Sequence, residues 1–525
     1  MKMVNVGKKP DYFPIRVSSN ILLYIGSGIY HSIAGAIKEL VNNSFDADAS
    51  VVSIDTHYPS YETIQITDNG IGMSSNDFRH AMESIGSSIK GEFNNRNITP
   101  KYRRPIIGHL GIGLLALSQI CERAIIESKQ SQSKTKFHAI LDFKDFQKNP
   151  SEKINEIKKE NQQKKKLSED NNVKEEDELG SEQLGYCLVY KNIPADEIEN
   201  GTKIILEGIR KEVIEILKDT YRNTDGIKKI TEKDLSWGEY LEDIRHQKSW
   251  EEICRGLKTA EKKITLQSLP YYYRFLWELA LQTPVIYLES GPFELDQKVF
   301  AEKKAQLKSY NFSLIVDGKE LFKPILLPSL KMDLNITKDI DYYIEEFEYQ
   351  NEVDNELLKF TGYIYWQKEQ ILPEAIRGIE IYIRNVGIDT YDKELLGFTN
   401  VNPASRAGQI SGEIYIEEGL ERALNIDRKS FRETDSHYLE IQKYIWKKIG
   451  STSKKDGIFG KSVEAYFERK KIKDKELDVQ RMNDIQSYIN KISDKNFQIE
   501  FNNSDCKIRV KSHSNSGANR TVIPG

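Results

Sequence analysis

The stretch that most constrains the fold runs from residue 36 to residue 73 and contains KELVNNSFDADAS followed by ITDNGIGM. In its first part Glu39, Asn43 and Asp46 recur at helical spacing, on a different face from a stripe of apolar residues. The second part alternates isoleucines like a strand and ends in Asp68–Gly70, a sequence typical of a tight turn. A polar helix face followed by a strand that ends in glycines predicts a nucleotide pocket.

The residues around this stretch predict an α+β domain. Helical spacing covers residues 30–48 and 74–85, and an apolar helix is expected after the glycines of IIGHLGIGLLALSQI. Patterns typical of strands occur at residues 51–57, 63–67, 123–128, 136–143, 185–191 and 202–207. Residues 149–184 hold almost no large apolar side chains, so we expect a mobile charged insertion between two strands there.

The second half of the sequence predicts a helical segment, a further mixed region and a helical end. Residues 208–282 are helical in pattern and rich in aromatics, which we expect to form core rather than a base-stacking surface. Strands are expected at 360–367, 378–384 and 412–417, a short helix at 418–424, amphipathic helices at 436–448 and 462–492, and a hairpin at 497–510.

Composition excludes several classes of protein. The net charge of the 525 residues is only −4, so no global basicity indicates nucleic acid. The four cysteines are far apart, which argues against a zinc site or a disulfide framework and favours a reducing cytoplasm. No run reaches the roughly 18 to 20 apolar residues of a membrane span, and residues 1–17 lack the apolar core of a signal peptide.

Each part of the predicted pocket has a chemical role. A carboxylate at a strand end, Asp68, can accept a hydrogen bond from the exocyclic amine of adenine, and glycines let the backbone approach the base. Backbone N–H groups at a glycine-rich helix start bind phosphate. Asn43 offers a neutral oxygen to Mg²⁺, and Glu39, one turn earlier, can polarise a water. Alone, each motif would be an ordinary turn or a solvated helix face; together they occur in this order within about 80 residues.

These motifs resemble the GHKL ATPases of the Bergerat fold, which include gyrase B, the ninety-kilodalton heat-shock chaperone, histidine kinases, MutL and the related MORC proteins. KELVNNSFDADAS is most similar to the MutL and MORC version of the family's Asn-bearing helix. The resemblance implies ATP and Mg²⁺ as cofactors, Glu39 as general base, Asn43 as magnesium ligand and Asp68 as adenine contact. The further nucleotide contacts that it implies are Asp46, Gly70, Gly72, Met73, Gly108, Gly111, Gly113 and Thr202.

Two further segments resemble the family less closely. ESIGSSIK is similar to the phosphate-contacting segment of MutL and MORC, which implies roles for Ser87, Ser88 and Lys90. GYIYWQ and RGIEIYIRNVGI resemble strands of the family's transducer domain, and ALNIDRKSF resembles the chaperone segment whose arginine reaches the γ-phosphate. That arginine corresponds to Arg428, with Arg384 and Lys429 as alternatives.

The resemblance implies four regions. We expect a Bergerat-type ATPase domain over residues 1–215, with a mixed sheet covered by helices on one face, and a helical connector over 216–290. A transducer-like α/β domain is expected over 291–435, followed by helices and a small hairpin over 436–525.

The function implied is a slow ATPase whose output is conformational, with ATP-driven homodimerisation or clamp closure. A MORC-like enzyme directed at DNA or active in defence is one alternative, and a chaperone-like ATPase acting on protein clients is another. A nucleotide-binding interaction protein that does not hydrolyse ATP also fits. A sensor kinase is disfavoured because the Asn-bearing helix begins near residue 30, and we find no acidic cluster for a nuclease in residues 290–525.

Overall fold

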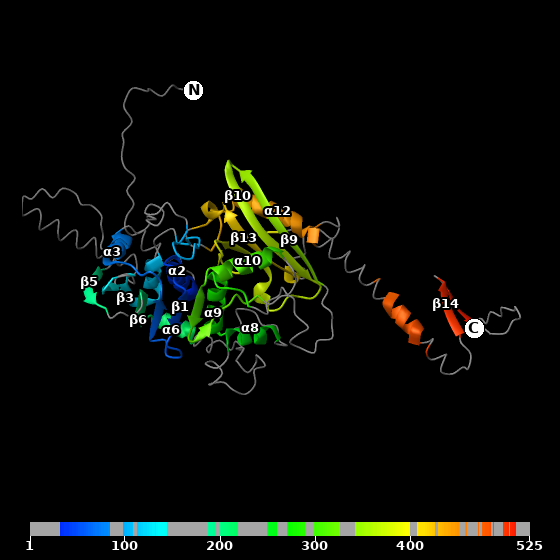
Figure 1. Cartoon of the computed structure of the whole chain (residues 1–525), viewed down its shortest axis with the longest axis horizontal. Coiled ribbons are helices and arrows are strands. Elements are labelled where there is room, and N and C mark those ends of the chain that lie inside the picture. Colours follow the sequence, from blue (N-terminus) through cyan, green and yellow to red (C-terminus); the bar gives the residue numbers. More distant parts are fainter. Residues whose placement is uncertain are drawn as a thin grey trace, which may run out of the picture. The chain divides into compact units, whose positions relative to one another are not determined.

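The structure is a computed structural model that describes residues 32–83, 98–108, 113–131, 133–143, 186–195, 200–218, 249–259, 270–288, 298–325, 342–398, 407–425 and 429–450, with shorter stretches beyond (457–458, 471, 475–484, 487, 497–502 and 505–510). The chain divides into two compact units, residues 1–446 and 447–525, which are described separately. The first unit contains two sheets with their helices (Figure 1).

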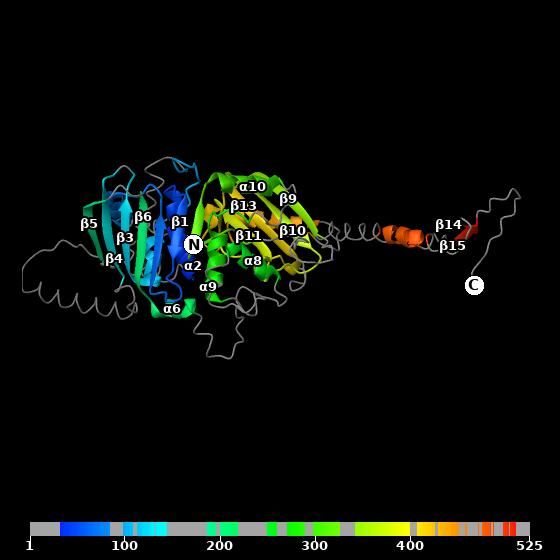
Figure 2. The same cartoon turned by 60° about the horizontal axis from the view of Figure 1, so that its bottom comes forward.

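The first sheet has eight strands in the order β5-β4-β3-β6-β2-β1-β7-β8 (Figure 2). Neighbouring strands are antiparallel except β1 and β7, which are parallel, so the sheet is mixed as predicted. The strands are β1 Val51–Asp55, β2 Thr63–Asp68, β3 Cys121–Lys129, β4 Thr135–Asp142, β5 Tyr186–Pro194, β6 Gly201–Ile209, β7 Ser313–Val316 and β8 Lys319–Glu320.

We call the first sheet and its helices the first half of this unit, and the second sheet and its helices the second half. Helix α2, Ile33–Asp46, lies at the centre of the first half. Ser32 caps its start, since the side-chain oxygen accepts a hydrogen bond from the Gly35 amide. Most of its residues are buried, and the helix contacts both α9 and the 3₁₀ helix η1. The other helices are α3 Ser75–Glu83, α6 Lys211–Leu217, α8 Trp250–Thr259, α9 Tyr271–Gln282 and α10 Lys298–Ser309.

The apolar helix predicted after the glycine box is a 3₁₀ helix. Gly113–Gln119 form this helix, η1. The residue that follows it, Ile120, is buried, and β3 begins at the next residue. A tighter, narrower helix suits such a short piece of chain.

The aromatic residues of the predicted helical region are core, as expected. Trp250 and Trp277 pack edge to face with ring centroids 6.3 Å apart, and Tyr271–Tyr273 and Phe275 of α9 are buried. The remaining members, Trp237 and Tyr240, lie outside the described residues.

The second sheet has the strand order β12-β11-β13-β10-β9, and only β11 and β13 are parallel. It contains the three strands predicted for this region. Its strands are β9 Tyr342–Val353, β10 Glu356–Gln367, β11 Gly378–Ile383, β12 Val386–Gly387 and β13 Ile410–Glu418. The short helix expected at 418–424 is the 3₁₀ turn η8, Glu421–Ala423.

The two faces of the second sheet have opposite chemistry. Helix α12, Ser436–Ile449, covers an aliphatic and aromatic face, where the Tyr444 ring contacts Phe347, Tyr349 and Phe360. The other face is buried and polar, and its centre is Glu413, whose carboxylate accepts hydrogen bonds from four tyrosine hydroxyls. These are Tyr287 (3.0 Å), Tyr363 (2.7 Å), Tyr391 (3.0 Å) and Tyr415 (2.7 Å).

The strand pairing changes the expected domain limits. A boundary at residue 290 would place β7 and β8 in the transducer-like region, but β7 pairs with β1 in register from Val51↔Ser313 to Ile54↔Val316. Residues 313–320 therefore complete the first sheet. Helix α12 packs on the second sheet, so residue 435 does not separate it from that sheet.

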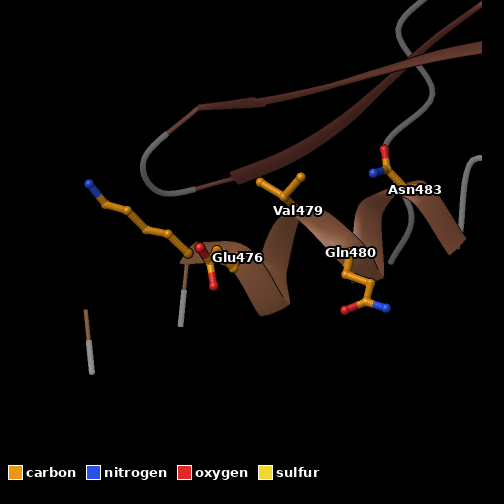
Figure 3. Close-up of a pocket in the computed structure, with 5 residues that line it drawn as sticks. Glu476, Val479, Gln480 and Asn483 are labelled. Carbon is orange, nitrogen blue, oxygen red and sulfur yellow. The ribbon is translucent and has the colours of Figure 1, made fainter. Parts of the chain in front are cut away.

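The second unit contains the predicted hairpin, β14 Phe497–Asn502 with β15 Asp505–Val510. Residues 475–484 are helical, as the amphipathic pattern predicted for this stretch. Glu476, Val479, Gln480 and Asn483 of this helix line a shallow hollow of about 340 Å³ (Figure 3). Among the described residues, no helix is both long and apolar enough to cross a membrane.

Candidate nucleotide site

Asp68, the last residue of β2, holds the centre of the candidate site. Its Oδ1 accepts hydrogen bonds from the amides of Gly70 (2.9 Å) and Thr202 (3.2 Å), and its Oδ2 accepts one from the Ser44 hydroxyl (2.9 Å). Burial raises the pKa of this carboxyl, and the hydrogen bonds from Gly70, Ser44 and Thr202 oppose the rise. Asp68 is thus held in place at the end of a strand by hydrogen bonds from the protein, and its contact with adenine stays a prediction.

The glycines beside Asp68 are required by close backbone packing. A Cβ on Gly70 would lie 2.7 Å from the Ala47 carbonyl oxygen, and one on Gly72, at φ +66°, would lie 2.1 Å from the Lys129 carbonyl oxygen. We expected these glycines to make room for a base; in the structure the atoms that exclude a side chain belong to the protein itself. The glycines therefore set the path of the chain around the site.

Thr202 and Met73 meet through a residue that the sequence analysis missed. The Ser128 hydroxyl lies 3.0 Å from the Thr202 hydroxyl and donates to the Gly201 carbonyl, while it accepts a hydrogen bond from the Met73 amide (2.9 Å). Ser128 lies on β3 and pairs with Thr202 on the neighbouring strand β6, whereas Met73 lies in the loop that follows β2. No local motif marks it, because its role depends on β3 pairing with β6.

Glu39 and Asn43 lie one helical turn apart on α2. Glu39 is buried, with 6% of its surface exposed, whereas Asn43 is exposed. This face of the helix therefore runs from the interior of the domain to solvent. Such an arrangement suits a base that acts within the protein and a metal ligand near its surface.

Asp46 connects α2 to the glycine box. Its two carboxylate oxygens accept hydrogen bonds from the amides of Ile107 and Gly108, both at 2.8 Å. The sequence predicted Asp46 as a pocket residue; the structure brings it to the first glycine of IGHLGIG. Gly113 begins η1, whereas Gly111 lies outside the described residues.

Four other predicted residues also lie outside the described part of the chain: Ser87, Ser88, Lys90 and Arg428. The two alternatives to Arg428 are described. The Lys429 ammonium lies 3.3 Å from the Ser32 hydroxyl at the start of α2 and 3.8 Å from the Asp389 carboxylate. The Arg384 guanidinium donates to the Ile106 carbonyl and pairs with Glu421.

Arg104 and Asp48 hold the loop that leads to the glycine box, and the sequence analysis missed both. Arg104 is fully buried and donates to the carbonyls of Phe45 (2.9 Å) and Tyr310 (3.0 Å). Burial lowers the pKa of its guanidinium to about 10. Asp48 accepts hydrogen bonds from Thr99 (2.5 Å) and the Lys101 amide (2.8 Å).

The side chains present fit a magnesium nucleotide. Asp68 is a partly buried acceptor for an amine, and the first glycine of the box is fixed on Asp46 at the end of α2. Asn43 supplies an exposed oxygen, and Mg²⁺ commonly takes few protein ligands and keeps several waters. Among the described residues, no group of three or more His, Cys, Asp or Glu side chains could hold a metal on its own.

A second hollow, of about 440 Å³, lies on strands β1, β2 and β7. Its lining includes Asp55, Gln65 and Asp317. It contains none of the predicted nucleotide contacts.

Comparison with known proteins supports the GHKL superfamily for the first part of the chain. Residues 30–176 match the family described as histidine kinase-, DNA gyrase B- and HSP90-like ATPases. The matched segment includes Glu39, Asn43, Asp68 and the glycine box, but not Thr202 or the second sheet.

Two relatives extend this comparison. A candidate type II restriction enzyme of Herpetosiphon aurantiacus, HgiDII, is 34% identical over 116 residues, which are 22% of this chain and 18% of that protein. The DNA mismatch repair protein MutL of Porphyromonas gingivalis is 42% identical over 60 residues, which are 11% of this chain and 10% of MutL. The chain thus matches less than a fifth of either relative.

Proposed function

We propose that this protein is a conformational switch that binds and hydrolyses Mg-ATP. The observation that carries the proposal is the Asp68 carboxylate, fixed at a strand end by two backbone amides and the Ser44 hydroxyl. Beside it, α2 presents Glu39 and Asn43 and holds the glycine box through Asp46. The family match over residues 30–176 supports the same reading.

The roles follow from the positions of these side chains. Asp68 accepts a hydrogen bond from the adenine amine, and the hydroxyls of Thr202 and Ser128 hold a water molecule beside the base. The backbone at Gly108 lies near the phosphates. Bound Mg-ATP would supply the terminal phosphoryl group that is transferred to water. Asn43 supplies a metal ligand. Glu39, buried one turn earlier, orients the attacking water and accepts its proton.

The switch requires the second half of the unit to respond to the third phosphate. Residues 428 and 429 provide two adjacent cations, and Lys429 reaches Ser32 at the N-terminal end of α2, about two turns before Glu39. A cation that binds the γ-phosphate holds the two halves together with ATP but not with ADP. ATP-dependent dimerisation is the expected output, as in the proteins that the sequence resembles.

We propose DNA as the partner of the cycle, in a MORC-like or defence role. The two relatives support it, since one is described as a DNA mismatch repair protein and the other as a restriction enzyme. The chaperone-like alternative rests on the segment ALNIDRKSF. Turnover measured with and without duplex DNA over a salt series separates the two, because stimulation by a phosphate backbone falls steeply with salt. Turnover that does not change when duplex DNA is added, at any salt concentration, would favour a protein client.

Glu39→Ala tests the proposed chemistry. We expect ATP binding to remain and turnover to fall about 10²–10⁴-fold, the usual contribution of a positioned base. Glu302→Ala, which removes a carboxylate on α10 that is 62% exposed, is the matched control and should leave turnover unchanged. Equal turnover in wild type and Glu39→Ala would remove Glu39 from the mechanism.

A further inference from the structure

The turn between β11 and β12 consists of two residues, Arg384 and Asn385. Both have positive φ, +53° and +66°, and Ile383 pairs directly with Val386. Such a two-residue turn suits asparagine, but arginine rarely adopts positive φ. The turn therefore places an arginine where the backbone alone does not favour one, and the contacts of its side chain account for this.

Both side chains of the turn contact the first half of the unit. The Arg384 guanidinium donates to the Ile106 carbonyl and is oriented by Glu421, which accepts from its Nε at 3.2 Å. Asn385 is buried, and its side-chain amide donates to the Tyr310 hydroxyl at 3.1 Å. The second sheet thus holds two points of the first half through one rigid turn.

The two residues contacted by the turn, Ile106 and Tyr310, are both connected to the C-terminal end of α2. Ile106 precedes Ile107 and Gly108, whose amides are bound by Asp46. The Tyr310 carbonyl is bound by Arg104, which also donates to the carbonyl of Phe45. Phe45 and Asp46 are the last two residues of α2, the helix that carries Glu39 and Asn43.

We propose that the Arg384–Asn385 turn is a positioning device that couples the second sheet to the glycine box and to the end of α2. The proposal rests on the ATPase function proposed above. Arg384 acts through the Ile106 carbonyl rather than on the nucleotide itself. A movement of the second sheet displaces Gly108 relative to Glu39, which alters the geometry of the reaction more than the affinity for ATP.

Kinetics of Arg384→Ala test this coupling. We expect kcat to fall about tenfold, because small misplacements of reacting groups are costly, while KM for ATP stays within about twofold. Arg384→Lys, which keeps one donor for the carbonyl, should recover most of the rate. Arg377→Ala is the matched control: its guanidinium also donates to a carbonyl, that of Ile371 at 2.7 Å, but entirely within the second half. It should leave both constants unchanged.

The second contact is tested by a double-mutant cycle. Asn385→Gly keeps a residue that tolerates positive φ and removes the amide, and Tyr310→Phe removes its partner. If the contact transmits position, each single variant should lower kcat by a similar factor and the double variant by no more than either. Fully multiplicative losses would overturn this part of the proposal.

Hydrogen exchange of the nucleotide-free protein separates this proposal from the ATPase assignment. In Arg384→Ala we expect the amides of Ile107 and Gly108 to exchange faster than in wild type, and in Arg377→Ala to be unchanged. Unchanged exchange in Arg384→Ala, or equal loss of kcat in Arg384→Ala and Arg377→Ala, would overturn the coupling. Absence of turnover in wild type with faster exchange in Arg384→Ala would reject the ATPase function and retain the coupling.

Discussion

Two hydrogen-bonded carboxylates, Asp68 and Glu413, show two ways in which this protein satisfies a charged side chain. Asp68 receives two of its three hydrogen bonds from backbone amides, whereas all four of those to Glu413 come from tyrosine hydroxyls. Asp68 lies at a strand end and is partly exposed, and Glu413 is fully buried. The first arrangement leaves a carboxylate available to a ligand. The second uses the whole carboxylate to hold parts of the protein together.

The largest effect should follow from removing the acceptor of the tyrosines. Glu413→Ala leaves four buried hydroxyls without their acceptor, and each unsatisfied group costs about 1–3 kcal/mol. We expect the free energy of unfolding to fall by at least about 3 kcal/mol, measured by denaturant titration. A change below about 1 kcal/mol would mean that water replaces the carboxylate and that Glu413 does not hold these segments together.

The same polar face should make stability depend on pH. Burial raises the pKa of Glu380 to about 8 and lowers the pKa of Lys323 to about 7. A raised carboxyl pKa means that the folded state binds the proton more tightly, so stability falls as pH rises from about 4.5 to about 8. A lowered amine pKa has the opposite sign, so stability rises from about pH 7 to about 10.5.

Glu380→Gln tests the falling part of this profile. The wild-type slope attributable to Glu380 should be about 1.4 kcal/mol per pH unit at most, and the variant should lose it between about pH 5 and 7. Lys323→Met is the companion variant and should remove the rising part. Parallel profiles for wild type and Glu380→Gln would contradict a buried, neutral Glu380.

The smallest effect on the free energy of unfolding is expected for a substitution of Asp68. The same substitution should clearly weaken nucleotide binding. Asp68→Asn keeps an acceptor for the Gly70 and Thr202 amides, so the protein should remain folded. Binding of a non-hydrolysable ATP analogue should weaken by about 1–3 kcal/mol, because the amine of the base loses its acceptor. Isothermal titration measures this.

Asp317→Asn is the control for that measurement. Asp317 also accepts three hydrogen bonds, from the Thr56 amide and hydroxyl and from Tyr272, but it lies at the other side of β1. Its substitution should leave analogue binding unchanged. Wild-type affinity in Asp68→Asn would reject Asp68 as the adenine contact.

The comparison also explains what could be predicted from sequence. The helix that carries Glu39 and Asn43 and the strand and turn around Asp68 lie close together in the sequence. Periodicity and spacing were therefore enough to predict these elements. The tyrosines around Glu413 come from residues 287 to 415, and no local pattern connects them. In the strands, Glu and Tyr alternate with isoleucine, which reads as one solvated and one buried face, although both faces are buried.

Contacts between distant segments were missed for the same reason. Arg104 was part of a stretch that looked irregular and basic, yet it is buried because Tyr310, about 200 residues later, supplies a carbonyl acceptor. The apolar pattern after the glycine box predicted a helix, but not its 3₁₀ form. Ser44 lies within the most informative motif, but only the position of Asp68 gives it a role.

The parallel pairing of β1 with β7 has a consequence for how the chain is made. The β1 edge stays open until residues 313–316 have left the ribosome, although β1 itself is synthesised more than 250 residues earlier. During that interval Ser50 and Ile54 lack the amide partners, Ser313 and Asp317, that they have in the finished sheet. The first sheet of the nascent chain therefore keeps an unpaired strand edge until this later segment has been synthesised.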